Sequence, residues 1–105
     1  MSLYGDWLPA TIAAGGKSSA EINLGDDFEW VQIFIPAIDS ANISFTVSET
    51  AGGTFQALGS GSQVITATTG GFTTVATIGG FQFIKVVSSE TQDSERLIRV
   101  RGSRR

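Results

Sequence analysis

Apolar and polar residues alternate with a period of two along much of this chain. The cleanest case is Asn42–Ser48, in which Ile43, Phe45 and Val47 fall on one face and polar residues on the other. Successive side chains of a strand point to opposite faces, so this pattern is typical of a strand with one buried face. No segment carries the 3.6-residue stripe of an amphipathic helix. We therefore predict an all-β protein, with at most one short helical turn near Pro36–Ala41.

The alternation predicts further strands elsewhere in the chain. They are Ala20–Leu24, Trp30–Ile35, Phe55–Ala57, Val64–Ile65, Val75–Ile78, Phe81–Ser88 and Leu97–Arg101. Phe81–Ser88 has large residues on both faces, which predicts a central strand. In Trp30–Ile35, Val31, Ile33 and Ile35 oppose Trp30 and Phe34. One of these two faces is core, and we expect a neighbouring subunit to cover the other at least in part.

Turn signals rich in glycine or proline separate the predicted strands. They are Gly15-Gly16, Gly25–Asp27, Pro36–Asp39, Gly52-Gly53, Gly59–Gly61, Gly70-Gly71 and Gly79-Gly80. A spacing of about ten residues between turns is typical of a β-sandwich or barrel, here with about eight antiparallel strands. The length of 105 residues suits a single domain over residues 1–105. We expect an N-terminal arm, residues 1–8, and a basic tail, residues 102–105.

Charge is unevenly distributed along the chain. Through Ile84 there are seven acidic residues and one basic residue, and from Lys85 onward six basic and three acidic ones. Five arginines lie in the last ten residues. Such a tail can bind nucleic acid, but no aromatic residue lies among these arginines to stack on bases, so we favour a salt-sensitive protein contact. One arrangement is head to tail, with the tail of one copy on the acidic body of another.

The residues needed for most enzyme chemistry are missing. The chain has no histidine and no cysteine, which removes the commonest general base and the thiol nucleophile. We expect no enzymatic activity, no catalytic residue and no cofactor. Asp26, Asp27 and Glu29 could hold calcium, but a solvated turn after Gly25 is the preferred interpretation, so no metal is expected. The apolar stretches are too short to span a membrane, and the absence of cysteine fits synthesis in a reducing compartment.

Only 16% of the residues are charged, against about 25% in a usual soluble domain. Either a partner covers part of the surface or serine and threonine solvate it, and the sequence leaves both open. Trp7-Leu8-Pro9 either pairs at a sheet edge or inserts into a neighbour. The candidate contact residues are Tyr4, Trp7, Leu8, Trp30, Phe34, Arg99, Arg101, Arg104 and Arg105.

Two segments resemble galactose-binding-type jelly rolls. They are VSETAGGTFQAL (Val47–Leu58) and FQFIKVVS (Phe81–Ser88). In that family they form a core hairpin and strand of an eight- or nine-stranded sandwich, and many members bind sugars. This chain has Phe-Ile-Lys where the family often has Tyr-Ile-Arg or Tyr-Val-Arg. The resemblance implies a jelly-roll-like sandwich rather than a sugar site.

A second resemblance covers most of the chain. Its segments are WLPxTIA (Trp7–Ala13), SAEINLG (Ser19–Gly25), VQIFIPA (Val31–Ala37), ANISF (Ala41–Phe45), GGTF (Gly52–Phe55), FIKV (Phe83–Val86) and QDSERLIRVR (Gln92–Arg101). Together they are similar to small structural proteins of tailed bacteriophages.

That second resemblance implies a capsid cement or decoration protein. Such a protein would form a homotrimer and bind the major capsid protein, in the virion, after synthesis in the host bacterial cytoplasm. Head and tail locations both stay open. The alternative function is a carbohydrate-binding module or an adhesion domain associated with a tail or fibre, which predicts a rim site with an exposed aromatic residue and polar neighbours.

Overall fold

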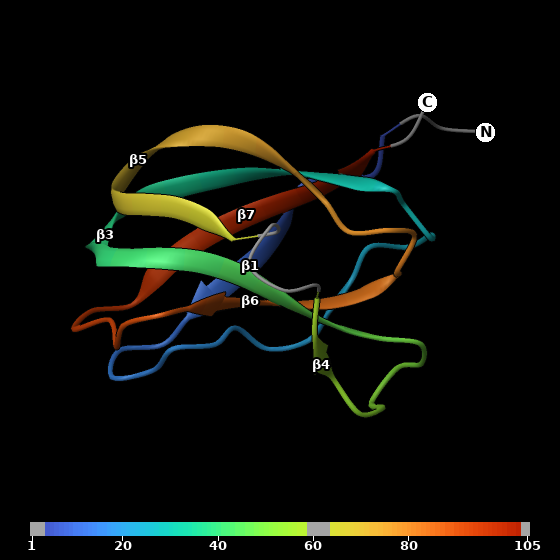
Figure 1. The fold of residues 1–105 in the computed structure, drawn as a ribbon, viewed down its shortest axis with the longest axis horizontal. Helices are drawn as coiled ribbons and strands as arrows, with labels where there is room; N and C mark the ends of the chain where they lie inside the picture. Colours follow the sequence, from blue (N-terminus) through green and yellow to red (C-terminus); the bar gives the residue numbers. More distant parts are fainter. Residues whose placement is uncertain (1–3, 59–63, 104–105) are drawn as a thin grey trace.

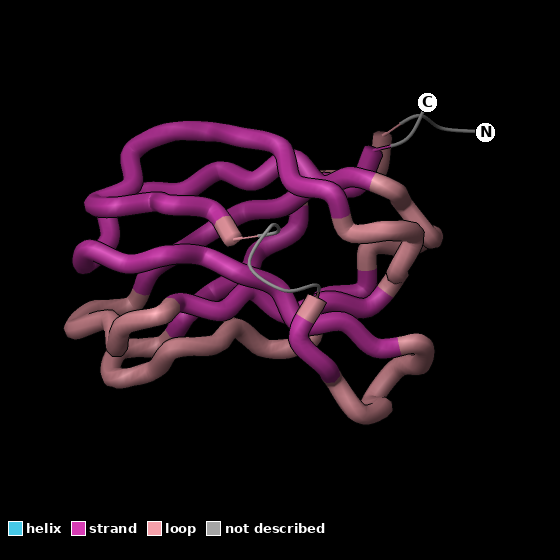
Figure 2. Tube along the Cα trace, viewed as in Figure 1, coloured by secondary structure: helices cyan, strands magenta, loops and turns pink. Residues whose placement is uncertain are grey.

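The protein is built from strands alone. The computed structural model describes residues 4–58 and 64–103, and that part of the chain contains seven strands and no helix (Figures 1 and 2). The strands are β1 (Leu8–Ile12), β2 (Ile22–Asn23), β3 (Trp30–Ser48), β4 (Gln56–Ala57), β5 (Ile65–Thr77), β6 (Phe83–Ser88) and β7 (Arg96–Ser103). Each pairs with its neighbours antiparallel. The predicted all-β fold is confirmed, while the turn at Gly59–Gly61 lies outside the described residues.

Strand β3 connects the whole sheet. One of its edges pairs with β7 along Trp30–Phe34 and then with β6 along Ile43–Ser48. Its opposite edge pairs with β5 and then β4. Strands β1 and β2 continue the sheet beyond β7 and β6, in the order β1-β7-β3-β6-β2. Because β3 pairs along both of its edges, the seven strands form one sheet that nearly closes into a barrel (Figure 1).

The predicted turn at Pro36–Asp39 is wrong, and the short helical turn that the sequence allowed near Pro36–Ala41 does not form. The chain stays in strand β3 and bends there, with register shifts against β5 between Ala37 and Asn42. A proline is tolerated in a strand at such an irregularity. Gly70, with φ of 72°, faces the bend, and a Cβ on it would lie 2.0 Å from the Pro36 carbonyl oxygen. Gly70-Gly71 therefore bends one long strand rather than separating two.

The core lies on the inner face of the sheet. Of the two faces of Trp30–Ile35, the one that carries Val31, Ile33 and Ile35 is buried in it. Val31, Ile33 and Ile35 are fully buried, whereas Phe34 is 40% exposed. The predicted inward set of Asn42–Ser48 is also buried. Strand β6 lies between β3 and β2 with Ile84 and Val86 inside, which confirms the central strand predicted there.

A buried glutamine fills the gap that the bend leaves between β6 and β7. Residues 89–95 join these two strands and run beside the bend, and Gln92 within them is fully buried. Its amide nitrogen donates to the Ser88 hydroxyl (3.1 Å) and to the main-chain oxygens of Asp39 and Glu90 (both 3.3 Å). Its Oε1 accepts from the Asp39 N–H at 2.8 Å. One side chain thus supplies the hydrogen bonds that a paired strand would make here.

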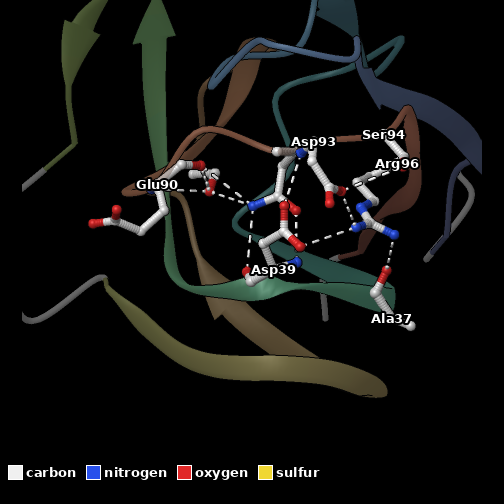
Figure 3. A network of polar contacts seen from close by, with 8 residues as sticks. Ala37, Asp39, Glu90, Asp93, Ser94 and Arg96 are labelled. Atoms are coloured by element: carbon white, nitrogen blue, oxygen red, sulfur yellow. Dashed lines mark hydrogen bonds and ion pairs between the residues drawn. The ribbon is translucent and has the colours of Figure 1, made fainter.

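Arg96 completes this network at the start of β7 (Figure 3). Its guanidinium donates to Asp39 Oδ1 at 3.2 Å, to Asp93 Oδ1 at 2.9 Å and to the Ala37 carbonyl oxygen at 3.2 Å. The Asp93 N–H donates to Asp39 Oδ2 at 2.7 Å, so Asp39 is held from two sides. Arg96 belongs to the basic end of the sequence, yet its charge is used inside the fold.

The two ends of the described chain lie together. Leu8 begins β1, which pairs with β7, so the edge-pairing alternative for Trp7-Leu8-Pro9 is the one observed. Tyr4 bridges to Ser103, and the Gly5 N–H donates to the Gly102 oxygen at 2.9 Å. Gly102 has no room for a side chain, since a Cβ would lie 2.1 Å from the Phe28 ring. Leu8, Gly102 and Ser103 are therefore strand residues rather than parts of an arm or tail.

We predict that Gln92→Ala destabilises the protein by about 1–3 kcal/mol, because it removes a buried amide and leaves the partly buried Asp39 N–H without a partner. Gln82→Ala is the matched control, since the Gln82 amide makes one exposed bond, to Asn23 at 2.8 Å. We expect that control to stay within about 0.5 kcal/mol of the wild type. Urea unfolding measures both free energies, and equal values for the two variants would contradict the assigned role of Gln92.

Candidate interaction surface

The outer face of β1, β7 and β3 collects most of the contact residues predicted from the sequence. Antiparallel pairing sets Arg99 opposite Phe34 on one side and Pro9 on the other, and Arg101 opposite Gln32. Directly opposed residues project from the same face of a sheet. This face is the one opposite Val31, Ile33 and Ile35, so its side chains point away from the core.

Aromatic rings and guanidinium groups stack alternately across this face. The Arg99 guanidinium lies 5.4 Å from the centres of both the Phe34 and Trp7 rings. The Arg101 guanidinium lies 4.8 Å from the Trp7 ring and 4.7 Å from the Tyr4 ring. The order is Phe34, Arg99, Trp7, Arg101, Tyr4, and we call these five residues the ladder. Each contact is within the range of a cation–π interaction.

The ladder holds its arginines in place without neutralising them. Arg101 also donates from Nε to Gln32 Oε1 at 2.8 Å, and its Nη2 contacts the same oxygen. Among the described residues neither Arg99 nor Arg101 forms an ion pair. A guanidinium stacked on rings keeps the donors along its edge available to a carboxylate. The ladder therefore presents two preorganised positive charges on an aromatic surface.

The ladder is accessible, and its apolar surroundings enlarge the patch. Tyr4, Trp7 and Phe34 are 52%, 36% and 40% exposed. Leu97 and Val75 are 51% and 58% exposed on the same face, where Val75 lies opposite Gln32 and Leu97 lies two residues before Arg99. Sequence reasoning missed both residues. The alternation of Leu97 with buried Ile98 and Val100 was the signal that could have placed it outside.

The other predicted contact residues are placed differently. Leu8 lies opposite Val100 and packs against the core, so it is not on the outer face. Trp30 is half-buried and shares the outer side of β3 with Gln32 and Phe34. Arg104 and Arg105 lie outside the described residues.

One hollow lies apart from the ladder, beside β4. Its volume is about 530 Å³, and it is partly open to solvent. Its lining is Val47, Ser48, Glu49, Thr50, Thr54, Gln56, Ala57, Leu58 and Phe81. Phe81 is half-buried and Gln56 is exposed, so the hollow combines an aromatic ring with polar groups at its rim.

The described residues include no group of three or more acidic, histidine or cysteine side chains placed to hold a metal ion. Within the acidic turn, Asp26 Oδ1 accepts the Asp27 N–H at 2.8 Å. Nor does any helix in the described part of the chain have the length and apolar character needed to cross a membrane.

We predict that Trp7 and Arg99 are energetically coupled. In a double-mutant cycle of Trp7→Ala and Arg99→Ala, the coupling free energy of unfolding should be about 0.5–1 kcal/mol, as for an exposed cation–π pair. The control cycle combines Trp7→Ala with Arg96→Ala, because Arg96 is held by Asp39 and Asp93 instead. That cycle should give no coupling. Additive effects in the first cycle would rule out the stacked arrangement in solution.

Comparison with known proteins gives a fold but no family. No family model matches the chain, and no curated protein matches it. Among solved structures, the SPBc2 prophage-derived protein YomS superposes with a TM-score of 0.59 at 14% identity, covering 99% of this chain and 97% of that one. The Drosophila NLP core, whose structure concerns pentamer formation and histone binding, gives a TM-score of 0.43 at 12% identity over 92% and 95%. The first of these likenesses shows that this chain and YomS share a fold over nearly their whole lengths.

Proposed function

We propose that this protein is a bacteriophage virion structural protein, of the cement or decoration type, which self-associates and binds the major capsid protein. The observation that carries the proposal is the ladder, an exposed row of three aromatic rings and two unpaired arginines on a rigid sheet face. The shared fold with a prophage-derived protein supports the phage origin. The location would be the virion, after synthesis in the host bacterial cytoplasm.

The ladder has the composition of a binding surface. Tryptophan, tyrosine and arginine are the residues that contribute most often to interface hot spots. Stacking fixes the side-chain conformations before binding, so less conformational entropy is lost when a partner docks. The partner we propose carries carboxylates that meet the edges of Arg99 and Arg101 and apolar groups that cover Trp7 and Phe34. Binding should weaken as salt concentration rises.

Self-association can use the same surface. Exposed carboxylates of a second copy, such as Glu49 and Glu90, offer the opposite charge. A contact between two different patches repeats head to tail and closes into a ring when the rotation allows. A ring of three, as the phage resemblance implies, would present three ladders to a capsid lattice and multiply weak contacts. In this proposal the protein works by contacts and catalyses no reaction.

A carbohydrate-binding module, or an adhesion domain of a tail or fibre, is the second candidate. It is favoured by the hollow beside β4, which combines the Phe81 ring with Gln56 and Glu49. A glycan array with the purified protein tests it. Specific sugar binding that is lost in Phe81→Ala and kept in Trp7→Ala would favour this candidate over the capsid one.

We predict that Arg99→Glu lowers affinity for capsids at least about tenfold, the effect of losing one hot-spot residue. Lys17→Glu makes the same change in net charge at an exposed site in the Ala13–Ser19 turn, and it should bind like the wild type. The measurement is co-sedimentation with capsids that lack the protein, at two salt concentrations.

Light scattering after size-exclusion chromatography gives the mass of both variants, and urea unfolding checks that each is folded. Mass spectrometry of purified virions determines whether they contain the protein. Absence from virions would reject the proposed function. Equal capsid binding by Arg99→Glu and Lys17→Glu would reject the ladder as its surface.

A further inference from the structure

Strand β5 has an edge with no partner in the described structure. It is 13 residues long, and among the described strands it pairs with β3 alone. In Figure 1 no other described strand runs beside the outer side of its second half, at the top of the molecule. An edge strand presents a row of N–H and C=O groups that can pair with another strand.

This edge also lacks the features that usually protect such strands. The sequence has no charged residue anywhere in residues 50–84, and its two prolines are Pro9 and Pro36. The other edges are poor templates, since β1 contains Pro9 and β2 and β4 have two residues each. The register of β5 against β3 shifts between Thr66 and Gly70, and from Phe72 to Thr77 it is unbroken. Six consecutive residues therefore offer a regular and uncharged edge.

Two large apolar side chains lie at this edge, on opposite faces of the strand. Phe72 is 38% exposed and lies opposite Ile35, on the core side. Val75 is 58% exposed and lies opposite Gln32, on the ladder side. A strand added beside Phe72–Thr77 would cover both residues and would also bond the free main-chain groups. The neighbouring Thr73, Thr74 and Thr77 are residues that suit cross-strand pairing.

We infer that the partner at this edge is a second copy of the chain, joined through antiparallel pairing of Phe72–Thr77 with itself. A symmetric pair brings each charged group close to its own copy, and a segment with no charge avoids that repulsion. In one continuous sheet, residues of the same face must oppose each other. The two-fold axis therefore passes at Thr74 or at Val75, and both ladders lie on the same side of the joined sheet.

This contact uses the main-chain groups of β5 rather than the arginines of the ladder, and it would double whatever assembly the ladder forms. The advantage of this β5 contact to a virion protein rests on the proposed function. Two ladders on one side of a joined sheet can bind one partner surface at the same time. The β5 contact itself does not depend on the proposed function. A two-fold contact requires an even number of copies in the assembly.

The test compares two lysine substitutions in the same strand. Val75→Lys puts a charge beside the two-fold axis, where it meets its own copy directly or on the diagonal, and should halve the mass measured by sedimentation equilibrium. Thr66→Lys adds the same charge to β5 beyond its register shifts against β3 and should leave the mass unchanged. Hydrogen exchange gives a second readout, since the outward amides of Phe72–Thr77 should be protected more strongly at high protein concentration in the wild type and in Thr66→Lys, but not in Val75→Lys.

The outcomes separate this inference from the proposed function. A dimer that Val75→Lys splits supports the β5 contact and argues against a head-to-tail ring. A hexamer reduced to a trimer supports both. A wild-type trimer or monomer, or a Val75→Lys variant with unchanged mass and unchanged protection, overturns the β5 contact. Capsid binding that is lost in Arg99→Glu would still support the ladder in that case.

Discussion

The structure depends on strand β3, which joins the other strands into one sheet, directly or through β6 and β7. Strand β3 must bend sharply between Pro36 and Ala41, yet a bend interrupts pairing on both of its edges. On one edge β5 bends with it, because Gly70 leaves space for the Pro36 carbonyl. On the other edge no strand follows the bend, and the buried amide of Gln92 bonds the main chain of Asp39 instead. Without these two local solutions the sheet would separate into two, and each half would expose unpaired main-chain groups.

The ladder is a consequence of the same strand. The first half of β3 pairs with β7 in unbroken register, which sets Phe34 beside Arg99 and Gln32 beside Arg101. Strand β1 then adds the N-terminal segment on the far edge of β7, so Trp7 comes between the two guanidinium groups. A shift of one residue in either pairing would turn these side chains into the core. Correct pairing of β1, β7 and β3 is therefore required for both the core and the proposed binding surface.

The sequence allowed the strands and their inner faces to be predicted where alternation was regular, as at Ile43, Phe45 and Val47. It also pointed to Tyr4, Trp7, Phe34, Arg99 and Arg101 as contact residues, but not to their stacking, which joins residues almost a hundred positions apart. The failures have a common cause. Pro36 and Gly70-Gly71 are local turn signals, and only the pairing of β3 with β5 makes them bends within long strands. Gln92 carries no local signal at all, since its role depends on Asp39, 53 residues away.

The arginines that lie close together in the sequence have different surroundings in the folded protein. Along the chain, the arginines form one basic run. In the fold, Arg96 turns inward to Asp39 and Asp93, while Arg99 and Arg101 stand on the outer face between aromatic rings. On the other side of β3, strand β5 carries no charge at all. A surface with fixed charge selects partners of opposite charge, whereas an uncharged strand edge accepts its own copy without repulsion. The two surfaces are adjacent on one sheet through the pairing of Gln32 with Val75, so contacts of both kinds can form at once and on the same side.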